Sequence, residues 1–159
     1  MLGVLSPKRY WRVMTVPEQQ HIKQKGYAEA MRYIANAKDY LKTAGKEESH
    51  YKDKKYVRTA CGTAYSGTLI ALDALLKIKG VEVPKGKRKT IDFYREAINK
   101  DRKLLNAFNT VYNVLHLNGY YDGETNIKTI QAGFESAIEV INKIKPDSRH
   151  GLHPYPEAL

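Results

Sequence analysis

The stretch Ala64–Leu76, which reads AYSGTLIALDALL, decides the fold because Asp73 is its one charged residue. It lies inside a longer segment, residues 52–79, whose apolar side chains recur every three or four positions. A helix that is apolar on most sides is buried at the centre of a bundle. We therefore predict a central helix over residues 52–79, ended by Gly80. Its main apolar stripe is Val57, Cys61, Ala64, Thr68, Leu72, Leu75 and Leu76.

Two glycines and the single cysteine of the chain fall in this helix. Gly62 and Gly67 each cost about 1 kcal/mol of helix propensity relative to alanine, so we expect them where another helix approaches closely. One cysteine cannot form a disulfide within the chain, and Cys61 is predicted to be a buried small hydrophobe. It is not expected to act as a nucleophile, because the neighbouring sequence supplies no base.

Upstream of the central helix, an amphipathic pattern predicts a helix that begins near Tyr27 and ends at Gly45. Residues 46–55 form a charged connection, in which Ser49 is the expected N-cap of the central helix. The sequence shows no strand-like alternation of useful length.

Downstream, Thr90 is placed to cap a segment whose apolar spacing continues to Leu115, with one polar interruption at Asp101. The interruption allows either one long helix or a break near Lys100, and we favour the break. Asp101 then lies close to a new helix N-terminus, where its charge suits the helix dipole.

A turn over residues 118–123 and a last helix over residues 125–145, stopped by Pro146, complete the pattern. Short loops between amphipathic helices favour an all-α, antiparallel bundle of four to five helices. We divide the chain into an N-terminal arm or extra helical segment (1–26), the helical-bundle domain (27–145) and a flexible C-terminal tail (146–159).

The chain carries a formal net charge of +10 and a pI near 9.6. Such a charge keeps a domain soluble, and it also suits nucleic acid or an acidic protein partner. If two basic clusters share one face, a nucleic-acid surface becomes the stronger interpretation. The first is the loop cluster, and the second lies at the start of the central helix. They are Lys85, Lys87, Arg88 and Lys89, and Lys52, Lys54, Lys55 and Arg58.

Three segments resemble the HEPN superfamily of small helical-bundle proteins. They are residues 27–41, residues 64–76, and the helix that ends Tyr112-Asn113-Val114-Leu115-His116. The chain also resembles an uncharacterised helical family from Bacteroidetes. The HEPN resemblance implies a helical bundle and, for its ribonuclease members, an arginine shortly before a histidine on one helix. Only His116 matches here, and Arg102 lies too far upstream, so the resemblance implies no catalytic pair.

Further candidate residues are aromatic or basic. Asn113 and His116 are three positions apart on a helix and are expected to line a small polar pocket, unless His116 only caps the helix or packs at the core edge. His150 and His153 have the spacing of two metal ligands, but we expect a disordered tail there rather than a metal site. Tyr10 and Trp11, flanked by basic residues, are suited to stacking on bases or to packing on a second subunit.

From these features we expect a non-catalytic, cytoplasmic protein that acts by protein–protein interaction, as a homodimer, and that needs no metal or cofactor. No stretch of the sequence is long and apolar enough to suggest a membrane span. The alternative is a nucleic-acid-binding, HEPN-like component of a toxin–antitoxin or defence system.

Overall fold

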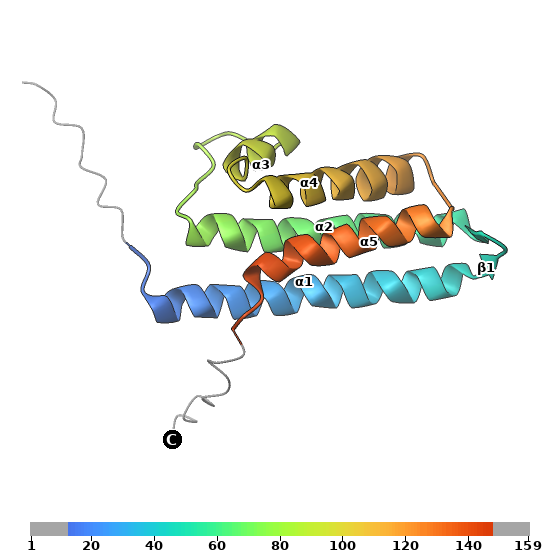
Figure 1. Ribbon diagram of the computed structural model, residues 1–159, viewed down its shortest axis with the longest axis horizontal. Coiled ribbons are helices and arrows are strands. Elements are labelled where there is room, and N and C mark those ends of the chain that lie inside the picture. The colour runs from blue at the N-terminus through green and yellow to red at the C-terminus, as the bar shows by residue number, and fades with distance from the viewer. Residues whose placement is uncertain (1–12, 148–159) are drawn as a thin grey trace, which may run out of the picture.

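A computed structural model describes residues 13–147, and it is an antiparallel helical bundle, as predicted. Figure 1 shows the long helices running back and forth along one axis. The first helix, α1 (Val16–Ala44), is followed by α2 (Lys54–Ile78), which returns beside it. The short α3 (Ile91–Ala97) leads into α4 (Arg102–Val111), and α5 (Ile127–Ile141) closes the bundle.

Helix α1 begins at Val16, earlier than the predicted start near Tyr27. The Thr15 side chain accepts a hydrogen bond from the Glu18 backbone, and the Glu18 carboxylate accepts one from the Thr15 backbone. This reciprocal capping box, with Pro17 in the first turn, starts a helix without a strong apolar stripe. Gly26 also fits inside this helix, because a Cβ there would meet Ala74 and Ile144 on neighbouring elements. Gly45 ends α1 at φ 70°, as expected.

The connection from α1 to α2 contains a small hairpin that the sequence did not predict. Its strands are β1 (Lys46–Glu47) and β2 (His50–Tyr51). Ser49 lies in the turn, and its carbonyl accepts a hydrogen bond from the Ile127 backbone at 2.9 Å. The prediction of Ser49 as the N-cap of α2 is therefore wrong. Asp53 caps the helix instead, accepting from the Lys55 backbone at 3.0 Å.

Helix α2 is the central element, as its apolar character predicted. It packs against α1, α5 and the segment that follows α4. Gly67 lies where α1 approaches α2 closely, since a Cβ at this position would come within 2.9 Å of the Tyr33 Cβ. The largest fully buried side chains around α2 are Phe108, Ile34, Leu72, Ile98, Leu104, Leu115, Ile130, Ile141, Ile144, Val57, Val111 and Val140.

The break predicted near Lys100 is confirmed. Thr90 caps α3 by accepting from the Phe93 backbone, and Asp101 caps α4 by accepting from the Leu104 backbone at 3.0 Å. The second carboxylate oxygen of Asp101 lies 2.9 Å from the Lys143 ammonium. These two interactions hold the pKa of Asp101 below its ordinary value.

The predicted turn at residues 118–123 is only partly correct. Helix α4 continues without interruption into a π-helix, η1 (Tyr112–Tyr121), and the chain turns at Asp122 and Gly123. Gly119 is a packing residue within η1, because a Cβ there would collide with the Cys61 side chain. After α5, the last turn tightens into a 3-10 helix, η2 (Asn142–Ile144), before Pro146.

Within residues 13–147, no helix combines the length and the apolar character needed to cross a membrane.

Candidate functional site

Four aromatic side chains of η1 and one of α2 form a single group, which we call the aromatic cluster. Its members are Tyr65 of α2 and Tyr112, His116, Tyr120 and Tyr121 of η1. Hydrogen bonds in a π-helix join residues five apart, so side chains four or five positions apart share a face. Tyr112, His116 and Tyr120 follow this spacing. π-Helical turns are rare and occur often at functional sites.

His116 lies at the centre of the aromatic cluster and contacts its four tyrosines. Its ring stacks on Tyr65, with centroids 4.3 Å apart and planes 25° apart. The Tyr120 ring is nearly parallel to it, at 6.1 Å and 11°. Tyr121 meets His116 edge-on at 5.0 Å, and Tyr112 is tilted against it at 5.3 Å. These separations lie within or just below the range of favourable aromatic pairs, about 4.5–7 Å between centroids, so the cluster is a preformed platform of aromatic rings.

The platform is partly open to solvent. Tyr120 and Tyr121 are 46% and 59% exposed, whereas His116, Tyr65 and Tyr112 are half-buried. A shallow hollow of about 550 Å³ adjoins it, lined by Tyr33, Thr59, Gly62, Thr63, Tyr65, Ser66, Leu69, His116 and Tyr120. Gly62 lets Tyr120 lie flat against α2, because a Cβ there would come within 3.0 Å of the ring. The expected close approach at both glycines of α2 is thus confirmed.

Burial determines the protonation states of two side chains of the platform, His116 and Tyr65. Desolvation lowers the pKa of His116, so its imidazole is neutral at physiological pH. Burial raises the pKa of Tyr65 to about 12, which keeps its phenol protonated. The rings therefore offer apolar faces and neutral hydrogen-bonding edges rather than charge.

Positive charge borders the platform on one side through Arg95 of α3. Its guanidinium carbon lies 5.1 Å from the centre of the Tyr112 ring, and its Nε donates to the Asn109 side chain at 2.8 Å. A weaker ion pair joins it to the exposed Asp92 at 3.7 Å. The Asn109 bond and the ring fix the orientation of Arg95 beside the cluster.

A second group of cations borders the other end. Lys54 and Arg58, from the first turns of α2, pack over Gly123, the residue that ends the turn after η1. Lys55 lies 4.8 Å above the Tyr56 ring on the same helix. Arg58 and Tyr65 are seven positions apart on α2, which corresponds to about 10 Å along the helix. The structure therefore brings part of the second predicted basic cluster next to the aromatic cluster, while Lys52 lies near Gly45.

The two basic clusters do not form one surface. The loop cluster follows the C-terminal end of α2, and the second cluster is at its N-terminal end, at opposite ends of the bundle (Figure 1). A helix of 25 residues is about 37 Å long. In the loop cluster, Lys85, Lys87 and Arg88 are exposed, and Lys89 is paired with Asp73 at 3.0 Å. Asp73 also accepts from the Tyr94 hydroxyl at 2.7 Å, so this contact stabilises the loop.

The remaining predicted residues lie apart from the platform or outside the described part of the chain. Asn113 is exposed and does not line the hollow beside His116, because the wider turn of η1 separates residues three apart. Tyr10, Trp11, His150 and His153 fall outside residues 13–147. The residues that the structure describes contain no group of three or more His, Cys, Asp or Glu side chains placed to hold a metal ion. Cys61 is fully buried, and desolvation raises its pKa to about 12, as expected for a packing residue.

Sequence reasoning missed all four tyrosines of the aromatic cluster, and Arg95, as members of the site. The spacing of Tyr112, His116 and Tyr120 was the available signal, but it also fits one face of an ordinary α-helix. Arg95 and Tyr65 come from other helices, so no local pattern joins them to His116.

The lowered pKa of His116 predicts a stability that falls as the pH falls. The unfolded histidine takes up its proton near pH 6.5, whereas the native one does so only at lower pH, so acidification favours unfolding through this window. Urea unfolding from about pH 7.5 to about pH 5.5 should therefore show a larger loss in the wild type than in His116→Phe, which keeps an aromatic ring without the titration. Because every other side chain is the same in the two proteins, parallel losses would contradict the prediction.

Comparisons with known proteins give a family but no activity. The model of a domain of unknown function, DUF5618, matches residues 25–146. A solved structure, a protein of unknown function from Dyadobacter fermentans, is 40% identical, with a TM-score of 0.69, over 76% of this chain and 94% of that chain. No curated protein matches. The expectation of a helical family without an established activity is thus confirmed.

Proposed function

This chain belongs to the DUF5618 family of unknown function, and from the geometry of its own site we propose that it binds single-stranded nucleic acid without cleaving it. The observation that carries the proposal is a half-exposed platform of stacked rings with cations at both ends. Single-stranded sites combine aromatic faces, on which bases stack, with a positive groove that follows the phosphates.

The placement of the cations supports a short strand across the platform. Arg95 lies beside Tyr112, and Lys54 and Arg58 lie against Gly123, just beyond the end of η1. Phosphates at the two edges would then hold one or more bases over Tyr120 and Tyr121. A duplex conceals the faces of its bases, so the proposal favours single strands.

The absence of cleavage is part of the proposal and follows from the chemistry of the site. A nuclease that uses no metal needs a positioned acid or base and a cation at the phosphate. The faces of the His116 ring pack against tyrosines, and the aromatic cluster holds no second group that titrates near neutral pH, so it supplies no acid–base pair for cleavage. A HEPN-like role in a defence or toxin–antitoxin system stays a prediction from the sequence, as does a cytoplasmic location.

Binding of labelled RNA and single-stranded DNA of about 10 nucleotides, followed by fluorescence anisotropy at several salt concentrations, tests the proposal. With phosphate contacts at Lys54, Arg58 and Arg95, log K should fall with log salt at a slope of about −2, or roughly −0.7 for each contact. Lys54→Gln with Arg58→Gln should weaken binding by more than about tenfold at low salt.

The matched control removes the same charge from the loop cluster. The double variant Lys85→Gln with Lys87→Gln changes the loop beyond the far end of α2. It should change the affinity for the oligonucleotide by less than about twofold. Equal effects of the two double variants would mean that net charge alone attracts the oligonucleotide. If the wild-type protein bound neither RNA nor single-stranded DNA at low salt, the proposal would be wrong.

A homodimer, the other function expected from the sequence, is a second candidate for the same exposed rings. Tyrosines are enriched at protein interfaces, and Tyr120 and Tyr121 are among the exposed large hydrophobics. Each copy, however, would bring Lys54, Arg58 and a net charge of +10 to the pair, and this repulsion favours nucleic acid over a second copy. Light scattering of the wild type and of Tyr121→Ala distinguishes the two. A wild-type dimer that dissociates in the variant would support the homodimer, and a strict wild-type monomer would argue against it.

A further inference from the structure

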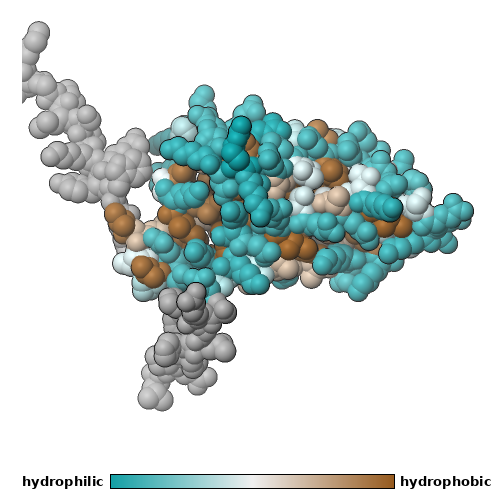
Figure 2. All heavy atoms as spheres, in the orientation of Figure 1, coloured by the Kyte–Doolittle hydropathy of each residue, from teal (hydrophilic) through white to brown (hydrophobic). Residues whose placement is uncertain are grey.

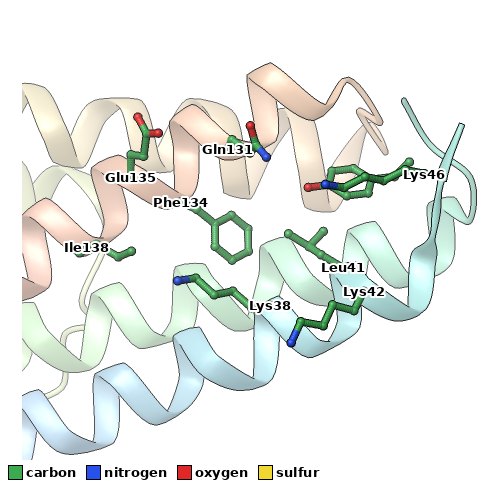
Figure 3. A pocket seen from close by; sticks show the side chains of 9 residues that line it. Lys38, Leu41, Lys42, Lys46, Gln131, Phe134, Glu135 and Ile138 are labelled. Atoms are coloured by element: carbon green, nitrogen blue, oxygen red, sulfur yellow. The ribbon is translucent and has the colours of Figure 1, made fainter. Parts of the chain in front are cut away.

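A groove separate from the aromatic cluster runs between α1 and α5 (Figure 3). Its volume is about 490 Å³, within the range of ligand-binding clefts. Leu41 of α1 and Phe134 of α5 point toward one another across it, and Ile138 continues the apolar floor along α5. Tyr51 of the hairpin also lines the groove.

The floor is apolar but incompletely covered by the bundle. Phe134 is only 5% exposed, whereas Leu41 and Ile138 are half-buried beside it. Figure 2 shows the face formed by α5 and α1 as mostly hydrophilic, with hydrophobic patches among the charged residues. The groove therefore leaves room for one more apolar element against the two helices.

The two rims of the groove differ in charge. Lys38 and Lys42 stand one helical turn apart on α1, and Lys46 continues the row beyond the end of the helix. Gln131 and Glu135 stand one turn apart on the α5 rim. Lys42 reaches Asp39 only at 3.8 Å, and both side chains are strongly exposed, so this pair neutralises little of the row.

We propose that the groove binds an acidic amphipathic helix of a partner protein. Its apolar stripe would lie on Leu41, Phe134 and Ile138, and carboxylates along one edge would face the lysine row. Helix-in-groove recognition uses this arrangement, with anchors at i, i+3, i+4 and i+7. A second copy of this chain fits the charge poorly, because each copy carries a net charge of +10.

The test uses the full-length protein and synthetic helical peptides of about 14 residues, or about 21 Å of helix. The probe has leucines at i, i+3, i+4 and i+7 and glutamates on the edge that would face α1. One comparison peptide carries lysines in place of the glutamates, and another has the same composition in scrambled order. The acidic amphipathic peptide should bind at least about tenfold more tightly than either, as measured by anisotropy.

Charge reversal locates the binding. The double variant Lys38→Glu with Lys42→Glu should weaken binding of the acidic peptide by more than about tenfold, because it repels the glutamates. It should also improve binding of the lysine peptide, because it attracts the lysines. Lys85→Glu with Lys87→Glu changes the net charge equally at exposed loop positions and should leave the affinity unchanged. The oligonucleotide of the proposed function should not displace the peptide, so the two proposals fail independently.

Three results would overturn this inference. The first is that the scrambled peptide binds as tightly as the acidic one, and the second is that the two double variants lose affinity equally. The third is that light scattering shows a dimer, and that the double variant Lys38→Glu with Lys42→Glu dissociates it. The last result would assign the groove to a second copy.

Discussion

Tyr121→Ala is expected to weaken binding of single-stranded oligonucleotides by about 5- to 150-fold, because stacking of a base on an aromatic side chain contributes about 1–3 kcal/mol. Tyr121 is the most exposed ring of the platform, at 59%, and it meets His116 and Tyr120 edge-on. The loss should appear at every salt concentration, since stacking does not depend on counterion release. The salt slope should therefore stay close to the wild-type value.

The design separates stacking from other roles of the side chain. Tyr121→Phe keeps the ring and should bind nearly as the wild type does, whereas a loss in this variant would point to the hydroxyl. Tyr40→Ala removes a tyrosine of α1 that is 38% exposed and belongs neither to the aromatic cluster nor to the lining of the hollow, so it should have little effect. Tyr121 is exposed but makes two edge-on ring contacts, so its removal should lower the free energy of unfolding by about 0.5–1.5 kcal/mol and leave the protein folded. Similar losses in Tyr40→Ala and Tyr121→Ala would contradict the stacking proposal.

The predictable part of the fold was the part governed by local patterns. The apolar run Ala64–Leu76 identified the central helix, and side-chain caps at Thr90 and Asp101 marked true helix starts. Each of these signals depends on residues within a turn or two of one another. A capping carboxylate or hydroxyl satisfies the same helix amide whatever the rest of the chain does.

The errors arose where distant segments decided the local structure. Ser49 had the chemistry of an N-cap, but its carbonyl pairs with Ile127, which lies about half the chain length further on. Asp53 was left to cap α2. The start of α1 at Val16 was missed because its first turns have few apolar residues, and the contact of Gly26 with Ala74 and Ile144 is not visible in sequence.

The candidate site was even less predictable than the fold. His116 was identified, but the partner expected for it, Asn113, does not line the hollow beside it. The widened turns of η1 determine which neighbours share its face. A π-helix has no composition that separates it from an α-helix, and its register here depends on packing against α2.

Gly119→Ala is expected to lower the free energy of unfolding by about 1–3 kcal/mol, although alanine is the better helix former by about 1 kcal/mol. The added Cβ would overlap the Cys61 side chain and lie 3.1 Å from the Val114 carbonyl oxygen. Neither neighbour moves easily, since Cys61 is fully buried in α2. Separating η1 from α2 would also shift His116 relative to Tyr65, so the stacked pair reports on the same change.

Urea unfolding of a double-mutant cycle measures this contact directly. Cys61→Ala removes the sulfur that lies nearest to the added methyl group, so the double variant should recover part of the loss, with a coupling of about 0.5–3 kcal/mol. Asn118→Ala, at an exposed position of η1, reports on helix propensity alone and should be neutral or slightly stabilising. If Gly119→Ala behaved like Asn118→Ala, the glycine would not be a packing residue, and the close contact between η1 and α2 that aligns the aromatic cluster would lose its support.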